Sequence, residues 1–360
     1  MKQTNAILCL QSSASAGDMP IMLHELLFCP ILTWVCRELT AQNVQHFFIV
    51  CDPKWKEAAL AAAPEGAVVC TRESEAVRAV KGTVIVSPSA VVPVASFSGS
   101  PVYTAQSGDL NKKDLSAVPE KAGHDLDWMP IRGMKELQRA GSLCRELLNA
   151  RWMSRGVTIV DGANTYIDPR CRIAAGTRLL PGTILRGETV IGADCEIGPN
   201  TMIRDCTIGD GCTVNASQLN ESTIQSRTTV GPFAYIRPGC SVGSDCRIGD
   251  FVELKNSTIG SGTKVSHLTY VGDSDVGEKV NFGCGTVTTN YDGKQKYRCT
   301  IGDNVFLGCN TNLVAPVTVE SGAYTAAGST ITEDVPADAL AVARARQTVK
   351  PRWAAKFRKK

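Results

Sequence analysis

The feature that most constrains this sequence is a branched aliphatic residue at every sixth position between Val157 and about Ile331. It recurs in three runs: Ile191, Ile197 and Ile203; Val230, Ile236, Val242, Ile248 and Leu254, then Ile259, Val265 and Val271; and Ile301, Leu307, Leu313, Val319, Thr325 and Ile331, with a lapse at Thr325. This period is typical of hexapeptide β-helix repeats. Each repeat predicts one face of a triangular coil, with the aliphatic side chain inside. The next residue is expected to turn the corner, where Gly, Asn or Asp takes a positive φ at low cost.

A polar segment at 267–296 interrupts this repeat. It begins with His-Leu-Thr-Tyr-Val-Gly-Asp at 267–273 and ends with Asn-Tyr-Asp-Gly-Lys-Gln-Lys at 290–296. The segment contains a titratable base, amides, phenols and lysines. Long irregular excursions from compact repeats tend to be functional, so we expect the chemistry of the protein here.

The residues before the repeat alternate between strand and helix patterns. Strands are expected over 6–10, 47–50, 67–70 and 83–86, and helices over 21–39, broken at Pro30, and 55–63. This order predicts a parallel sheet of about four strands. Residues 105–127 read as a polar loop, and 129–155 as a helical arm that packs on a neighbouring domain and ends at Gly156. The predicted division is an α/β domain at 1–125, a helical arm at 126–156, a β-helix at 157–334 and an irregular basic tail at 335–360.

Composition excludes several classes of protein. The formal net charge of +3 provides no broad electrostatic footprint for nucleic acid or membrane. The 15 cysteines include no C-x-x-C pair and only one histidine follows residue 124, so a zinc cluster is disfavoured. We expect reduced, mostly buried cysteines in a soluble, cytoplasmic protein. No run reaches the ~18 apolar residues that span a bilayer, and no secretory leader is recognisable.

Four segments carry a family resemblance from about Gly156 onward. They read Gly-Pro-Phe-Ala-Tyr-Ile-Arg-Pro-Gly at 231–239, Phe-Val-Glu-Leu-Lys at 251–255, Ser-His-Leu-Thr-Tyr-Val-Gly-Asp at 266–273 and Asn-Tyr-Asp-Gly at 290–293. Together they resemble the C-terminal half of the bacterial bifunctional UDP-N-acetylglucosamine pyrophosphorylase/glucosamine-1-phosphate N-acetyltransferase family. The resemblance implies a left-handed parallel β-helix, a homotrimer with its site between subunits, and acetyl transfer from acetyl-CoA to glucosamine-1-phosphate. That reaction serves UDP-N-acetylglucosamine biosynthesis for peptidoglycan and lipopolysaccharide.

The residues of the β-helix fit this chemistry. An amine must be neutral to attack a thioester, so a base that titrates near neutral pH is required. His267 is the only histidine in the predicted β-helix. The resemblance places Glu253 beside this base, to orient the ring and stabilise the imidazolium. It assigns the sugar phosphate to Arg237, Lys255 and Lys296 and the sugar to Tyr270 and Asn281; an Arg fork with Lys charges suits a phosphate dianion.

The resemblance also assigns contacts to coenzyme A. These are Cys284, Asn290, Tyr291, Cys309, Ala327 and Arg344. Cys284 and Cys309 depart from the family pattern, in which Ala and Ser are common at these positions. Small side chains at both positions keep the space open, and backbone contacts survive the change. Gly328 and its small neighbours leave room along a groove.

The front half departs further from the family's uridylyltransferase domain. That domain has a loop of the pattern G-x-G-T-R-M followed by Pro-Lys, whereas residues 11–19 here lack the loop glycines and the arginine, and the lysine is also missing. Met19-Pro20, Leu23 and His24 still match the pattern. No Asp or Glu occurs between Glu75 and Asp109, where the family has a magnesium ligand, and Ile-Arg-Gly at 131–133 replaces its Val-Asn-Asn. Without these groups a triphosphate and Mg²⁺ are poorly held, so we expect uridylyl transfer to be lost and the domain to serve as a structural or docking remnant.

Several alternatives remain open from the sequence. They are a fully bifunctional enzyme, a hexapeptide acyltransferase for a different amine, and a catalytically silent scaffold. A γ-type carbonic anhydrase shares the prism but needs three histidines, which the β-helix does not have.

Overall fold

A computed structural model describes residues 4–10, 18–94, 99–124 and 127–358 of the 360-residue chain. The chain divides into two compact units, residues 1–190 and 191–360. The loop at 11–17, in which the family's glycines are missing, lies outside the described residues. Among the helices that are described, none is long and apolar enough to cross a membrane.

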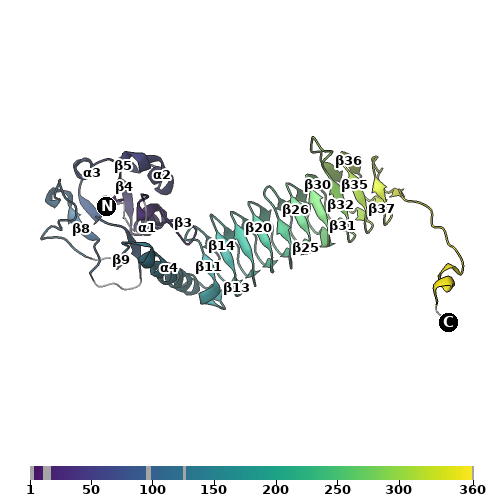
Figure 1. Ribbon diagram of the computed structural model, residues 1–360, viewed down its shortest axis with the longest axis horizontal. Coiled ribbons are helices and arrows are strands. Elements are labelled where there is room, and N and C mark those ends of the chain that lie inside the picture. Colours follow the sequence, from purple (N-terminus) through teal and green to yellow (C-terminus); the bar gives the residue numbers. More distant parts are fainter. Residues whose placement is uncertain (1–3, 11–17, 95–98, 125–126, 359–360) are drawn as a thin grey trace. The chain divides into compact units, whose positions relative to one another are not determined.

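The first unit contains a five-stranded sheet (Figure 1). Its strands are, in spatial order, β5 (Val68–Cys70), β4 (Val44–Val50), β1 (Thr4–Cys9), β6 (Thr83–Ser87) and β8 (Tyr103–Gln106). The first four are parallel, as predicted, whereas β8 is antiparallel to β6. Strand β8 was not predicted from the sequence, because it is an edge strand of only four residues. Its Tyr103 and Ala105 are buried, and Thr104 and Gln106 are more exposed.

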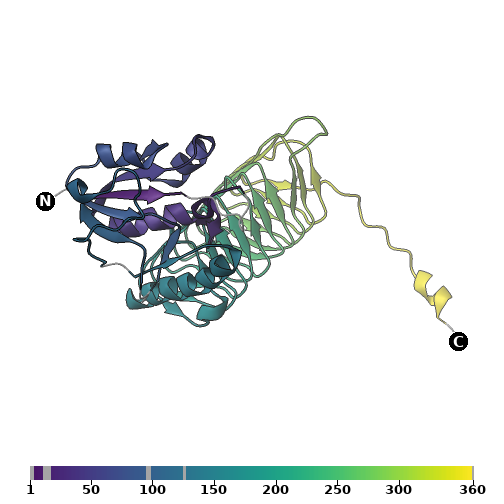
Figure 2. The ribbon, with the colours of Figure 1, turned by 60° about the vertical axis from the view of Figure 1, so that its left-hand side comes forward.

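Helices lie on both sides of these strands (Figure 2). They are α1 (Ile31–Ala41), α2 (Lys56–Ala62) and α3 (Glu73–Ala79). Residues of α1 and α2 share a core with one face of the sheet, and residues of α3 with the other. Of the helix expected over 21–39, only the part after Pro30 forms, as α1, and the prediction of helix before Pro30 is wrong. The preceding residues form η1 (Ile21–Leu23) and a hairpin of β2 (Glu25–Leu26) and β3 (Cys29–Pro30).

The helical arm is shorter than predicted. Helix α4 spans Met134–Ser154, and its Leu137, Ala140, Cys144 and Leu148 enter the apolar core of the α/β region. The prediction of helix from residue 129 is wrong, because β9 (Trp128–Pro130) pairs with β7 (Val91–Pro93) instead. Short 3₁₀ turns complete the unit: η2 (Pro53–Trp55), η3 (Ser107–Asp109) and η4 (Gly162–Asn164).

Triangular coils begin in the first unit and fill the second. The early strands are β10 (Thr158–Ile159), β11 (Tyr166–Ile167), β12 (Arg172–Ile173), β13 (Arg178–Leu179), β14 (Ile184–Arg186) and, at the boundary, β15 (Val190–Ile191). Strand β10 pairs with β13 in parallel, and β11 with β14. Each strand is two or three residues long, as a six-residue repeat with a turn requires.

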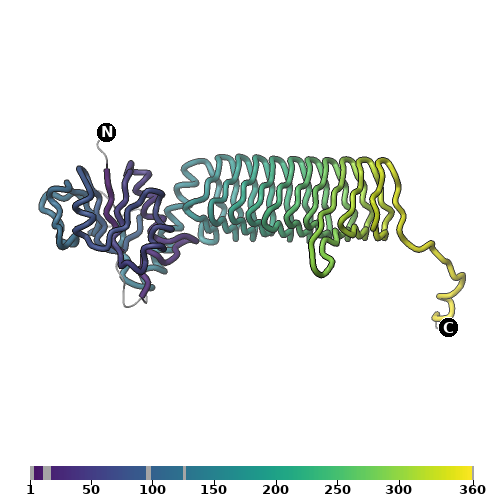
Figure 3. The backbone as a smooth tube through the Cα atoms, turned by 90° about the horizontal axis from the view of Figure 1, so that it is seen from above, coloured from purple at the N-terminus to yellow at the C-terminus, as the bar shows by residue number. Residues whose placement is uncertain are grey.

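In the second unit successive coils stack on one another (Figure 3). Their strands form three parallel sheets, one for each face of the coil. The first face has β16 (Glu196–Ile197), β19 (Thr213–Val214), β22 (Thr229–Val230), β25 (Arg247–Asp250), β28 (Lys264–His267), β31 (Asn281–Phe282), β34 (Phe306–Leu307), β37 (Tyr324–Thr325) and β39 (Leu340–Ala341). The second has β17 (Met202–Arg204), β20 (Gln218–Asn220), β23 (Tyr235–Ile236), β26 (Glu253–Lys255), β29 (Tyr270–Gly272), β32 (Val287–Thr289), β35 (Asn312–Val314) and β38 (Thr330–Ile331). The third has β18 (Thr207–Ile208), β21 (Thr223–Ile224), β24 (Ser241–Val242), β27 (Thr258–Ile259), β30 (Ser274–Val276), β33 (Cys299–Ile301) and β36 (Val317–Val319).

The sixth-residue aliphatics form the core of the coils. Ile236, Leu254 and Val271, for example, are fully buried. Thr325, which replaces an aliphatic residue of the repeat, is also buried. Its hydroxyl is hydrogen-bonded: Thr325 Oγ1 accepts a hydrogen bond from Gly308 N at 3.1 Å and lies 3.0 Å from Thr311 Oγ1. A paired hydroxyl is tolerated inside the prism where an unpaired one is not.

The role expected for the glycines after the aliphatics is wrong. Gly249 and Gly260 do not have a positive φ; the left-handed corners fall two or three residues after an aliphatic, as at Asp194 and Asn256. These glycines are required because the next coil passes too close for a side chain. A Cβ at Gly249 would lie 2.0 Å from Ser266 O, and one at Gly260 would lie 2.4 Å from Gly277 C.

Two segments depart from the coils. The loop between β32 and β33, residues 290–298, projects from the stack (Figure 3). Strand β39 pairs with β37 beyond residue 334, the predicted end of the β-helix, and η5 (Trp353–Phe357) follows near the C-terminus. The four-part division of the chain stays a prediction.

Candidate active site

His267 and Asp250 form a hydrogen-bonded pair on the first face of the coil. Asp250 ends β25 and His267 ends β28, and the parallel register places the two residues opposite each other. His267 Nδ1 lies 2.7 Å from Asp250 Oδ1, and both side chains are partly exposed. The hydrogen bond from His267 lowers the pKa of Asp250 below its usual value. With Nδ1–H donated to a carboxylate, Nε2 is left as the nitrogen that can accept a proton.

Glu253 takes a different partner from the one predicted. It was expected to orient His267, but its Oε1 accepts a hydrogen bond from Arg237 Nη1 at 2.9 Å. The corner at Phe251, with a φ of 56°, separates Asp250 on the first face from Glu253 on the second. The carboxylate that is in register with the histidine is therefore that of Asp250. The ion pair also raises the pKa of Arg237.

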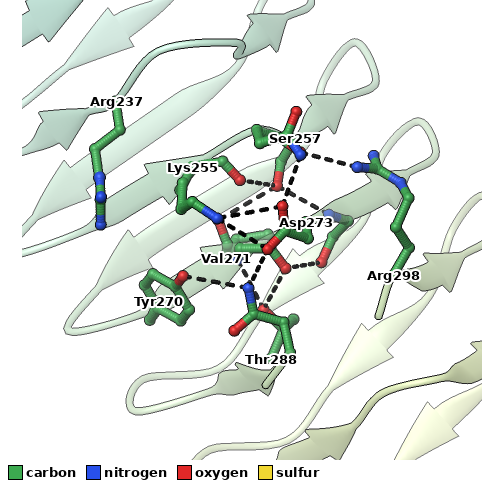
Figure 4. Close-up of polar contacts among 12 residues, drawn as sticks. Arg237, Lys255, Ser257, Tyr270, Val271, Asp273, Thr288 and Arg298 are labelled. Carbon is green, nitrogen blue, oxygen red and sulfur yellow. Dashed lines mark hydrogen bonds and ion pairs between the residues drawn. The ribbon is translucent and has the colours of Figure 1, made fainter. Parts of the chain in front are cut away.

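A buried network on the second face joins several predicted substrate residues (Figure 4). Its centre is Asp273, which is 5% exposed. Lys255 Nζ lies 3.0 Å from Asp273 Oδ2, and Asn290 Nδ2 also donates to Oδ2. Asn290 Nδ2 lies 3.5 Å from the hydroxyl of Tyr270. Burial alone would raise the pKa of Asp273, but the hydrogen bonds from Asn256, Lys255 and Asn290 outweigh it and lower that pKa.

This depressed pKa gives the network a pH-dependent contribution to stability. The carboxylate contributes fully above the ordinary aspartate pKa of about 3.9, and the contribution is lost as the pH falls through the lower folded value. We therefore expect Asp273→Asn to reduce the free energy of unfolding more at pH 7 than at pH 3. Urea unfolding of both proteins at the two pH values measures this; an equal loss at both would contradict it.

The projecting loop carries the third predicted phosphate-binding cation, Lys296. Lys296 forms an isolated bridge with Tyr291, and Asp292 Oδ1 accepts hydrogen bonds from Lys294 N and Gln295 N, both at 2.7 Å. The other two predicted cations lie on neighbouring coils of the second face: Lys255 ends β26, and Arg237 directly follows β23, which pairs with β26.

The predicted acetyl-CoA residues fall into two groups. Cys284, Cys309 and Ala327 follow one corner of three successive coils: Asn310 N donates to Cys284 O and Gly328 N to Cys309 O, each at 2.8 Å. Cys284 is half-buried and Cys309 exposed, whereas the other cysteines are buried. Arg344 approaches Gly328, with its Cδ 3.8 Å from where a Cβ would stand. Asn290 and Tyr291 belong instead to the loop.

Asn281, predicted to hold the sugar, lies on the same face as His267. It starts β31, which pairs with β28 in parallel. The β-helix therefore carries a basic nitrogen and an amide on one face, and cations, a phenol and a buried carboxylate on the next. This arrangement suits a phosphorylated ligand with a group that loses a proton.

The sequence analysis missed two of these residues, Asp250 and Asp273. The signal that could have found them is the length of one coil. Asp250 precedes His267 by 17 residues, and Asn256 precedes Asp273 by the same number. Residues one coil apart share a position on neighbouring strands, so a polar pair at this spacing is a candidate contact. Among the described residues, no group of three or more His, Cys, Asp or Glu could hold a metal ion.

Comparisons with known proteins relate the chain to a family of bacterial transferases. Residues 188–217, 221–256 and 298–333 match the family described as Bacterial transferase hexapeptide (six repeats). The chain is 51% identical over 239 residues to the Bifunctional protein GlmU of Clostridium perfringens, covering 66% of this chain and 53% of that protein. It is 53% identical over 254 residues to the protein of the same name from Clostridium acetobutylicum, covering 68% and 56%. Among solved structures, LpxA from Acinetobacter baumannii covers 52% of this chain and 71% of its own, with 21% identity and a TM-score of 0.38.

The family resemblance predicted from the sequence is thereby confirmed over two-thirds of the chain, as is the left-handed parallel β-helix of hexapeptide repeats. The chain spans about half the length of the curated relatives that it matches.

Proposed function

We propose that this chain, a homologue of the bifunctional GlmU proteins, is an N-acetyltransferase that moves acetyl from acetyl-CoA to the amine of glucosamine-1-phosphate. The observation that carries the proposal is the His267–Asp250 pair, set in a β-helix whose neighbouring face carries Lys255 and Arg237 on adjacent coils. Lys296 lies in the projecting loop that follows this face. The family resemblance supplies the identity of the sugar phosphate and the donor. A homotrimer with the site between subunits is part of the proposal.

His267 acts as the general base in this scheme. The amine of the sugar forms a C–N bond to the thioester carbonyl carbon, and His267 Nε2 takes the proton that the amine loses. The C–S bond breaks, and the thiolate of coenzyme A leaves with a proton returned from the imidazolium. Asp250 holds the ring in the required tautomer and stabilises its charged form, as carboxylate partners of catalytic histidines do.

The cations bind the phosphate of the acceptor. Arg237 offers a planar fork, although one of its nitrogens is held by Glu253, and Lys255 and Lys296 supply point charges. Burial, the largest single contribution, lowers the pKa of Lys255, but the hydrogen bond to Asp273 and the attraction of its negative charge together contribute more, so the pKa is raised. Lys255 therefore stays charged across the range in which an acetyl transfer to a neutral amine operates.

We propose further that uridylyl transfer is lost. The support is the sequence between Glu75 and Asp109, which offers no carboxylate for Mg²⁺, and the missing glycines and cations of the triphosphate loop. The α/β region then serves as a structural or docking remnant.

A thiol-release assay with acetyl-CoA tests the function. Acceptors are glucosamine-1-phosphate, glucosamine-6-phosphate, glucosamine and an amino sugar nucleotide, and parallel tubes hold UTP, Mg²⁺ and N-acetylglucosamine-1-phosphate for pyrophosphate detection. We expect thiol release with glucosamine-1-phosphate and no pyrophosphate. Thiol release only with another amine would mean that this amine is the substrate. Formation of pyrophosphate would support the hypothesis of a bifunctional enzyme. No thiol release from folded protein would favour a scaffold.

Asp250→Asn is expected to lower kcat/KM about tenfold or more, because a neutral amide stabilises the imidazolium less than a carboxylate. Steady-state kinetics of Asp250→Asn with glucosamine-1-phosphate and acetyl-CoA measure this effect. Asp245→Asn is the matched control: that carboxylate also faces solvent on the β-helix and also has a lowered pKa, but its partner is Arg227. A kcat/KM of Asp250→Asn that equals that of Asp245→Asn would remove Asp250 from the mechanism.

A further inference from the structure

Asp273 receives hydrogen bonds from three side chains that belong to two different parts of the site. Asn256 Nδ2 donates to Oδ1 at 2.6 Å, Lys255 Nζ to Oδ2 at 3.0 Å, and Asn290 Nδ2 to Oδ2. Lys255 is a proposed phosphate ligand and Asn290 a proposed acetyl-CoA contact. The Oδ2 atom of Asp273 therefore accepts hydrogen bonds from one residue of each proposed subsite.

The backbone fixes this carboxylate in place. Asp273 N donates to Lys255 O at 2.9 Å, and Cys299 N donates to Asp273 O at 3.2 Å. The residue has a φ of 48°, a conformation that Asp and Asn adopt more readily than other non-glycine residues. With both backbone groups bonded to neighbouring coils, the side chain points at Lys255 and Asn290 without rearrangement.

From this geometry we propose that Asp273 is a positioning residue that holds Lys255 and Asn290 together and so ties the sugar-phosphate subsite to the acetyl-CoA subsite. The inference rests on the proposed function and extends it. We assign Asp273 no contact with either substrate; it acts through its two partners. The carboxylate is buried and fully engaged, so its loss leaves a partly buried ammonium without its counter-charge and a buried amide without its acceptor.

An ion pair at the C-terminal end of the projecting loop supplies a control. Arg298 forms a two-pronged ion pair with Asp275, at 2.9 and 2.6 Å, and its Nη1 donates to Asn256 O at 3.1 Å. Asp275 lies two residues after Asp273 and is largely exposed. Asp275→Asn therefore removes a carboxylate from the same segment and weakens the base of the loop, but leaves Lys255 and Asn290 with their acceptor.

Steady-state kinetics of Asp273→Asn and Asp275→Asn test the proposal. In Asp273→Asn we expect KM to rise about tenfold for glucosamine-1-phosphate and also for acetyl-CoA, each the loss of one charge-assisted hydrogen bond. We expect kcat to change less than threefold, because His267 and Asp250 keep their contact in this variant. Asp275→Asn is expected to remain within about twofold of wild type.

A double variant separates positioning from a general loss of structure. In a Lys255→Met background, Asp273→Asn should no longer raise KM for glucosamine-1-phosphate, whereas its effect on acetyl-CoA should persist. An equal effect in both backgrounds, or a rise in only one of the two KM values, would overturn the proposal.

Binding measurements distinguish failure of this inference from failure of the proposed function. If wild type releases no thiol, calorimetry with coenzyme A and with inorganic phosphate replaces the kinetics. Weaker binding of both probes to Asp273→Asn, but not to Asp275→Asn, would support the shared anchor without the assigned reaction. Unchanged binding, or no binding of either probe to wild type, would refute it.

Discussion

His267→Ala is expected to reduce thiol release from acetyl-CoA about 10²- to 10⁴-fold, the range that a positioned general base contributes. The side chain is half-exposed and its polar partner is the partly exposed Asp250. Removing the ring therefore leaves no cavity in the prism and no buried group unpaired, and we expect the midpoint of urea unfolding to change little. The rate should be measured with both substrates saturating, so that weaker substrate binding is not mistaken for a slower chemical step.

Two controls identify the loss with the base. His46→Ala removes an exposed histidine from β4 of the α/β region and is expected to leave the rate unchanged. Free imidazole added to His267→Ala is expected to restore part of the activity, since a small base can occupy the space that the ring leaves. A variant that retains most of the wild-type rate would show that another group, or water, takes the proton.

The repeat is the part of this fold that a sequence predicts best. A six-residue period buries every inward aliphatic in the same way, so the core of the coils follows from Ile236, Leu254 and Val271 without knowledge of anything distant. The α/β region is harder, because β8 is a short edge strand and the segment around Pro130 pairs with β7 instead of extending α4. These strand pairings join residues that are distant in the sequence, so the local pattern of apolar and polar residues does not predict them.

The candidate active site was likewise predicted only in part. Residue type pointed to His267, and the family resemblance to Lys255 and Lys296, but the resemblance's assignment of Glu253 as the partner of His267 did not match the geometry. Which carboxylate meets the ring depends on the register between β25 and β28 and on the corner at Phe251. A shift of three residues moves a side chain from one face of the prism to the next. The spacing of residues within one motif therefore predicts contacts across a corner poorly. A spacing of one whole coil predicts contacts between neighbouring strands well.

Gly249→Ala is expected to destabilise the protein by at least the ~1–3 kcal/mol that overpacking costs, and to disable the site as well. The obstacle to the new methyl group is the main-chain oxygen of Ser266, 2.0 Å from the Cβ position. A backbone atom cannot turn away as a flexible side chain can, so the two coils must separate locally. Gly249 precedes Asp250 and Ser266 precedes His267, so this separation pulls apart the two residues whose 2.7 Å contact defines the proposed base.

Gly243→Ala is the matched comparison, because its Cβ would lie 2.7 Å from Ser261 N, another backbone atom of the next coil. Neither residue adjoins the His267–Asp250 pair. Both variants should therefore unfold at lower urea concentration than wild type, whereas only Gly249→Ala should lose thiol release when assayed under conditions in which each remains folded. Equal losses of activity would mean that the reaction depends on the integrity of the whole prism. Full activity in a folded Gly249→Ala would mean that the proton acceptor does not depend on the register of β25 and β28.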